Sequence, residues 1–100
     1  MKLTKEQYLL NCLSEECAEV VQRVTKALRF GLSEIQEGQE LTNAQRLVYE
    51  YNDLLGVVEV LTELGTVPID GIGDRKQIEA KKEKLLKFME HSRNAGILED

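Results

Sequence analysis

The segments SEECAEVVQRVTKALRFG at residues 14–31 and LTNAQRLVYEYNDLLGVVEVLTELG at residues 41–65 decide the fold. Apolar residues in both segments recur every three or four positions, which is the period of an amphipathic α-helix. A glycine closes each segment, at Gly31 and Gly65, as is common just after the end of a helix. Both segments are therefore predicted to be helices that pack through their apolar faces.

Three helix starts are marked by a capping box, in which a Thr or Asp is followed three residues later by Gln. The pairs are Thr4 with Gln7, Thr42 with Gln45, and Asp74 with Gln77. The sequence thus predicts helices over residues 4–30, 42–64 and 74–93. The connection at residues 31–41 is long for a helix hairpin and acidic, which indicates either an active-site flap or an extra turn of helix.

Length and composition favour one small all-α domain over residues 1–100, a helical bundle with three main helices. A chain of 100 residues is near the size at which burying enough apolar surface alone becomes difficult. The apolar arcs of the first two helices also span about half of each circumference, more than one neighbouring helix can cover. We therefore expect homo-oligomerisation, as a dimer or tetramer, to complete the bundle.

The charge pattern argues against several partners. The chain has 18 acidic and 13 basic residues, and no Lys/Arg block exceeds two residues. Nothing in this pattern attracts a phosphate backbone over a wide surface, so nucleic acid is not an expected partner. No apolar run approaches membrane-spanning length and no signal-peptide core is present, so we expect no membrane contact and a cytoplasmic protein.

Acidic residues intrude on the apolar faces of the first two helices. They are Glu16, Glu19, Glu50 and Asp53. At about 100° per residue, the first two lie at the edge of one apolar arc, and Glu50 falls inside the next. Ionised carboxylates at such positions are strongly unfavourable unless cations compensate them, and Arg23 and Arg46 could balance only two of the four. A hard divalent cation, Mg²⁺ with Mn²⁺ as a substitute, best satisfies the remainder, so these four carboxylates are the predicted metal ligands.

The two acidic segments resemble a known signature. EECAE at residues 15–19 and EYND at residues 50–53 are similar to the E-E-x-x-E and E-x-x-D motifs of MazG-like all-α NTP pyrophosphohydrolases. The resemblance covers the first two helices, about half of the chain. It implies a helical bundle assembled as dimers or tetramers. It also implies Mg²⁺-dependent cleavage of a nucleoside triphosphate between the α and β phosphates, which releases the monophosphate and pyrophosphate.

Carried over by position, the resemblance makes Glu16, Glu19, Glu50 and Asp53 the metal ligands. A water activated by the metal would attack the α-phosphorus in line. Glu15 and Glu19 are then the candidate catalytic residues, acting as general base or in support of the metal ligands. The chain departs from the family in a rather long gap between the motifs and in the absence of tryptophan.

Basic residues near the acids are candidate substrate contacts. Arg23 and Lys26 share the helix face of Glu19, and Arg46 precedes Glu50 by one turn; either phosphate contact or pairing with the acids fits these positions. Further candidates flank the apolar stripe of the third helix, where relatives often carry an asparagine. They are Lys81 and Lys82, whose alternative is a solvated helix flank.

A second function class also fits the pattern. A non-catalytic helical oligomerisation or interaction module could use the same acids in salt bridges with a partner. Glu50 discriminates between the two hypotheses, because a scaffold has no need of a carboxylate on an apolar face. The single histidine, His91, follows Glu90 directly and cannot supply the Glu-x-x-His pairs of di-iron bundles, so that class is not expected.

Overall fold

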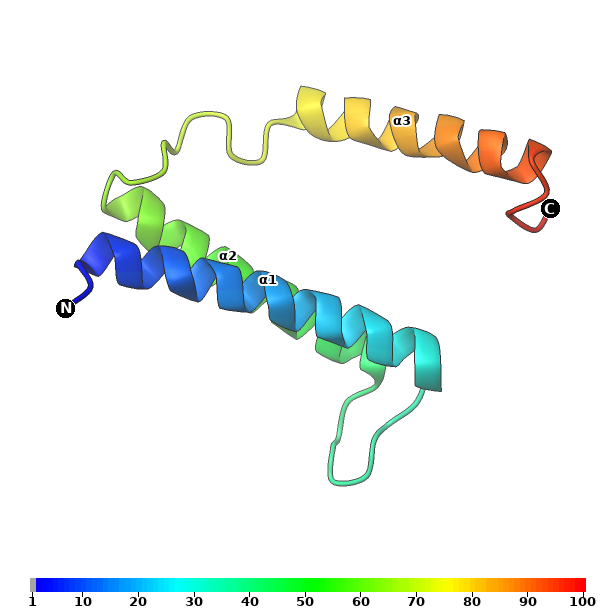
Figure 1. The fold of residues 1–100 in the computed structure, drawn as a ribbon, viewed down its shortest axis with the longest axis horizontal. Coiled ribbons are helices and arrows are strands. Elements are labelled where there is room, and N and C mark those ends of the chain that lie inside the picture. Colours follow the sequence, from blue (N-terminus) through cyan, green and yellow to red (C-terminus); the bar gives the residue numbers. More distant parts are fainter. Residues whose placement is uncertain (1) are drawn as a thin grey trace. The chain divides into compact units, whose positions relative to one another are not determined.

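The computed structural model describes residues 2–100 and contains three helices (Figure 1). They are α1 (Lys5–Phe30), α2 (Asn43–Glu63) and α3 (Arg75–Asn94). Residues 2–100 contain no strand, so the predicted all-α class is confirmed, and each helix boundary lies within one residue of its predicted position. The chain divides into two compact units, Met1–Pro68 and Ile69–Asp100. The single domain and its completion by oligomerisation stay predictions.

The capping boxes explain where the helices begin. Thr4 accepts a hydrogen bond from the Gln7 backbone N–H at 3.0 Å, and the Gln7 side chain accepts one from the Thr4 N–H at 2.9 Å. Thr42 and Gln45 form the same reciprocal pair at 3.1 and 2.9 Å. These bonds satisfy backbone donors that the first turn of a helix leaves free. At α3 the Asp74 carboxylate accepts from the Gln77 backbone N–H at 3.1 Å, but the Asp74 N–H donates to the Gly71 carbonyl and not to the Gln77 side chain, so the third box is half formed.

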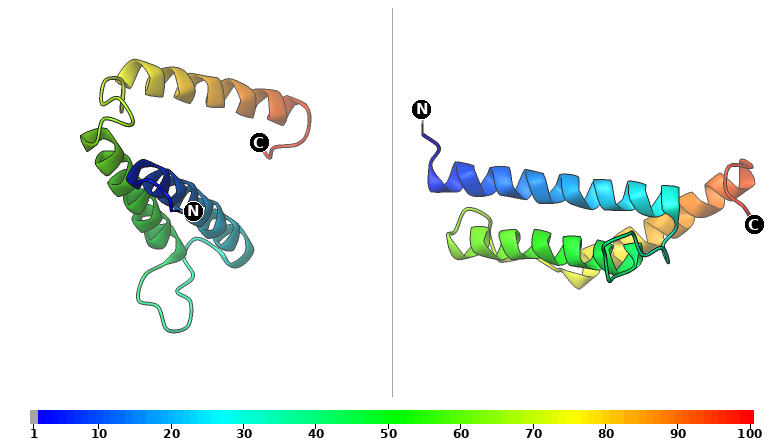
Figure 2. Two further views of the ribbon diagram at one scale, coloured as in Figure 1. Left: turned by 60° about the vertical axis from the view of Figure 1, so that its left-hand side comes forward. Right: turned by 90° about the horizontal axis from the view of Figure 1, so that it is seen from below.

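Helices α1 and α2 lie side by side as an antiparallel hairpin (Figures 1 and 2). At one end, Thr66 after α2 donates its hydroxyl to the Glu6 carboxylate at 3.3 Å. Four of the described residues are buried, all of them in the hairpin and its ends. They are Arg23, Ala27, Asn43 and Leu61. Two of these four are polar, so the hairpin alone has a thin apolar core.

The connection between α1 and α2 is an ordered loop fastened to α2. Gly31 ends α1 with φ of 98°, a backbone conformation that glycine adopts without strain. The Asn43 backbone N–H donates to the Glu34 carbonyl at 2.9 Å, and its buried amide donates to the Gly31 carbonyl at 2.8 Å and to the Glu34 carboxylate at 3.2 Å. Residues 31–42 contain turns and no helix. The alternative of an extra helical turn is therefore wrong.

The second unit consists of α3 and the segments that flank it. Its apolar stripe is exposed, and the exposed residues include Ile78, Leu85, Phe88 and Met89. After α3 the chain turns back at Gly96, and the Ile97 N–H donates to the Ser92 carbonyl at 2.9 Å. None of the helices in residues 2–100 combines the length and apolar character needed to cross a bilayer. A cytoplasmic location stays a prediction.

Candidate metal and phosphate site

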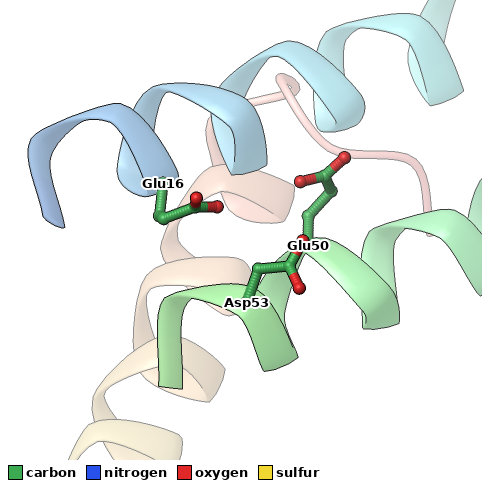
Figure 3. A group of neighbouring side chains, drawn as sticks. All are labelled: Glu16, Glu50 and Asp53. Atoms are coloured by element: carbon green, nitrogen blue, oxygen red, sulfur yellow. The ribbon is translucent and has the colours of Figure 1, made fainter. Parts of the chain in front are cut away.

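Three of the four predicted metal ligands meet between the two helices of the hairpin. Glu16 from α1 and Glu50 and Asp53 from α2 each offer a carboxylate oxygen, and these oxygens lie within 4.8 Å of one another. Figure 3 shows the Glu16 carboxylate pointing from α1 toward the two side chains of α2. Glu16 and Glu50 are half-buried and Asp53 is exposed. The cluster therefore has one open side, through which a ligand could reach it.

Helix geometry brings these three side chains together. Glu50 and Asp53 are three residues apart, so they are neighbours on one face of α2. The antiparallel packing of α1 against α2 then brings Glu16, from the middle of α1, beside that face (Figure 3). Neither motif alone creates the cluster, because its members come from both helices.

Glu15 and Glu19 lie on the outer side of the cluster. Both side chains are exposed, and Glu19 is not part of the group of three carboxylates that converge. Position 19 is rotated by about 60° from position 16 around the axis of α1, which turns it away from α2. The roles of Glu19 as a metal ligand and of Glu15 and Glu19 as catalytic residues stay predictions.

The surroundings of Glu16 disfavour the negative charge of its carboxylate. The pKa of Glu16 is raised above its ordinary value of 4.5, first because partial burial removes water from its carboxylate. Charge repulsion then adds to the shift. The repelling carboxylates are Asp53, Glu50, Glu19 and Glu15, in decreasing order of effect. A bound cation would relieve both causes.

No basic side chain in residues 2–100 forms an ion pair with this cluster. The ion pairs that the structure contains over these residues are on α3, where Arg75 and Lys82 contact Glu79. Three converging carboxylates suit Mg²⁺, which prefers oxygen ligands and usually keeps positions for water and substrate phosphates. The donor set thus fits the predicted ion.

The candidate phosphate contacts differ in their surroundings. Arg23 is buried, whereas Lys26 and Arg46 are half-buried. Arg46 donates from Nη1 to the Gln36 side-chain oxygen in the 31–42 loop. Within the described part of the chain, none of these three basic residues forms an ion pair with an acid. The structure therefore does not show the alternative, in which they pair with the acidic residues.

The remaining two candidates, Lys81 and Lys82, belong to the second unit. Both are exposed, and Lys82 lies 3.4 Å from the Glu79 carboxylate. An ion pair as exposed as this one is weak, so it would not prevent Lys82 from binding a phosphate. Contact of either lysine with substrate stays a prediction.

Two features of the site had no signal in the sequence pattern. Asn43 is fully buried and fixes the 31–42 loop, although an asparagine just inside a helix start is usually exposed. Gln36 holds Arg46 from that loop. Both depend on how the loop folds back on α2, which helical periodicity does not determine.

The MazG-like resemblance rests on segments 15–19 and 50–53, and the structure brings Glu16, Glu50 and Asp53 of these segments together. Comparison with protein-family models, with curated proteins and with solved structures gave no significant match for the chain. Membership of the family therefore stays a prediction.

Proposed function

We propose that this protein is a Mg²⁺-dependent nucleoside triphosphate pyrophosphohydrolase. The observation that carries the proposal is the convergence of Glu16, Glu50 and Asp53 within 4.8 Å, without a basic partner in residues 2–100. If these carboxylates had a purely structural role, the repulsion between their negative charges would have no compensation. The similarity of segments 15–19 and 50–53 to the MazG-like motifs supports the choice of reaction.

In this proposal Glu16, Glu50 and Asp53 would hold the ion, Mg²⁺ or in its place Mn²⁺, with Glu19 as a further ligand. When bound, the ion would neutralise phosphate charge and activate a water. The water oxygen forms a bond to the α-phosphorus while the bond from that phosphorus to the α,β-bridging oxygen breaks, so pyrophosphate leaves with the bond electrons. Glu15 or Glu19 would accept the water proton.

The positive side chains would bind the rest of the substrate. Arg23, Lys26 and Arg46 lie on the hairpin that carries the carboxylates, and they are candidate phosphate contacts. Lys81 and Lys82 are further candidates from α3. Cationic groups that hold the phosphates in line for attack supply much of the catalysis in phosphoryl transfer.

We also propose that the protein is a homo-oligomer, a dimer or tetramer. Val21 and Leu28 on α1 are 65% and 83% exposed, although both belong to its apolar arc. An apolar hollow of about 340 Å³ opens near the loop end of the hairpin. Its lining residues are Val24, Ala27, Leu28, Leu32 and Leu47. Apolar surface of this extent is typical of a face that is covered on association.

The exposed apolar residues also favour the second candidate function, a non-catalytic interaction module. In that case basic groups of a partner would neutralise the carboxylate cluster. The two functions differ in their response to Mg²⁺, because a preformed metal site stabilises the fold when its ion binds. Thermal melts with Mg²⁺ and with chelator should differ for the enzyme and coincide for the module.

The deciding experiment is a panel of nucleoside triphosphates with identification of the products. We expect pyrophosphate and a nucleoside monophosphate from at least one member of the panel with Mg²⁺, and no turnover with chelator. Glu50→Gln should be inactive, whereas Glu59→Gln, an exposed acid on the same helix, should retain activity. Orthophosphate as the sole product, or no turnover across the panel, would contradict the proposal.

A further inference from the structure

Arg23 is a buried cation without a partner. Only 5% of the residue is exposed, and its Nε and Nη1 atoms are inaccessible to solvent and have no hydrogen-bond partner in residues 2–100. A buried donor left unpaired is unfavourable, and more so when it carries charge. Such groups are rare in folded proteins, and each one calls for an explanation. An anion that binds beside Arg23 would provide one.

The position of Arg23 connects it with the carboxylate cluster. It follows Glu16 by seven residues, which places both on the same face of α1, about 10 Å apart along the axis. Long side chains on a helix lean toward its N-terminus, which favours an Arg23 side chain directed toward the turn that carries Glu19. From the opposite helix the Glu50 carboxylate reaches toward α1 (Figure 3). Helix spacing thus places Arg23 about two turns from Glu16 toward the C-terminal end of α1, on the face that carries the cluster.

Two more cations lie on the same side of the cluster. Lys26 is one turn beyond Arg23 on α1, and Arg46 is one turn before Glu50 on α2, so both lie toward the 31–42 loop. Both are half-buried, and the bond of Arg46 to the neutral amide of Gln36 leaves its charge unpaired. The hairpin thus carries a set of acids and a neighbouring set of cations, and no ion pair in residues 2–100 joins the two sets.

We propose that Arg23, Lys26 and Arg46 form an anion subsite that receives the β and γ phosphates and holds the pyrophosphate product. A chain of phosphates that begins at the carboxylates would reach these cations by running along the hairpin toward the 31–42 loop. The nucleoside would then extend toward the opposite end of the hairpin. Guanidinium groups suit this task because they bind phosphate oxygens through paired hydrogen bonds. The assignment of the β and γ phosphates rests on the proposed function, whereas pyrophosphate binding does not require turnover.

The test is calorimetric titration of the full-length protein with inorganic pyrophosphate, both in chelator and with Mg²⁺. We expect the wild type to bind pyrophosphate more tightly than orthophosphate, and Arg23→Met to weaken pyrophosphate binding at least tenfold. Arg29→Met is the matched control, because it removes the same charge from the end of α1, where Arg29 lies over the Phe30 ring. This variant should bind pyrophosphate as the wild type does.

Absence of pyrophosphate binding, or equal affinity of the wild type and a folded Arg23→Met variant, would overturn the subsite. If circular dichroism shows that Arg23→Met is unfolded, Lys26→Met decides in its place, and unchanged affinity in that variant overturns the proposal. Binding that depends on Arg23 without turnover of any nucleotide would support the subsite and refute the enzyme. Turnover with pyrophosphate affinity that is independent of Arg23 would refute the subsite and leave the enzyme standing.

Discussion

Replacing Arg23 by methionine should stabilise the ligand-free protein. The variant removes a buried charge and two inaccessible, unpartnered nitrogens, Nε and Nη1. Each buried donor without a partner lowers the free energy of unfolding by about 1–3 kcal/mol, so the removal of both should raise it by about 2–6 kcal/mol. Methionine keeps most of the apolar stem but loses some packing contacts, so we expect the free energy of unfolding to rise by about 2 kcal/mol. For a domain of this size the melting temperature should then rise by about 10 °C.

The assay is urea denaturation followed by circular dichroism in the presence of chelator. Arg46→Met is the control, because the Arg46 guanidinium donates to Gln36 and its removal should lower the free energy of unfolding by about 0.5–1.5 kcal/mol. Pyrophosphate should stabilise the wild type in the same assay, and at the same concentration it should stabilise Arg23→Met less. If Arg23→Met is less stable than the wild type, the guanidinium has an acceptor within the folded protein, and the reasoning that makes it an anion receptor fails.

Four other outcomes are expected. Glu50→Gln should abolish turnover and keep the chelator-treated fold at least as stable as the wild type; turnover at the wild-type rate would show that Glu50 is not a ligand. Leu61→Ala should lower the free energy of unfolding by about 2–5 kcal/mol in urea, because this leucine is 0% exposed; a smaller change would contradict its place in the core. Since the pKa of Glu16 is raised in the folded state, its carboxyl favours folding below pH 4.5 and loses that contribution as the pH rises through the raised value. In chelator, the stability of the wild type relative to Glu16→Gln should therefore fall as the pH rises from 4.5, and a constant difference would refute this. Light scattering at micromolar concentration should give the mass of a dimer or tetramer, and a folded monomer would refute the proposed assembly.

The sequence predicted the helices well because local chemistry fixes their ends. The boxes at Thr4 and Thr42 form as expected, and Gly31 ends α1 with the positive φ that its position requires. Asp74 forms only half of its box, since its backbone N–H donates to the Gly71 carbonyl at 3.2 Å and not to the Gln77 side chain.

Residue spacing predicted on which face of its helix each acidic residue of the candidate site lies. The spacing of Glu50 and Asp53 placed both on the face of α2 that meets Glu16. The same reasoning included Glu19, which is not in the converging group. Positions 16 and 19 differ by about 60° around the axis of α1, and residue periodicity does not predict which of them faces α2. The burial of Arg23 depends on the packing of the whole hairpin, and residue spacing alone does not report it.

The most direct test of the metal site is binding of Mn²⁺, followed by electron paramagnetic resonance, in the wild type and in Glu50→Gln. The account predicts that the wild type binds Mn²⁺, that added Mg²⁺ displaces it, and that the variant binds it at least tenfold more weakly because it lacks one of the three converging carboxylates. Glu59→Gln should match the wild type. No bound Mn²⁺ at millimolar concentration, or equal affinity in the wild type and Glu50→Gln, would contradict a metal site formed by Glu16, Glu50 and Asp53.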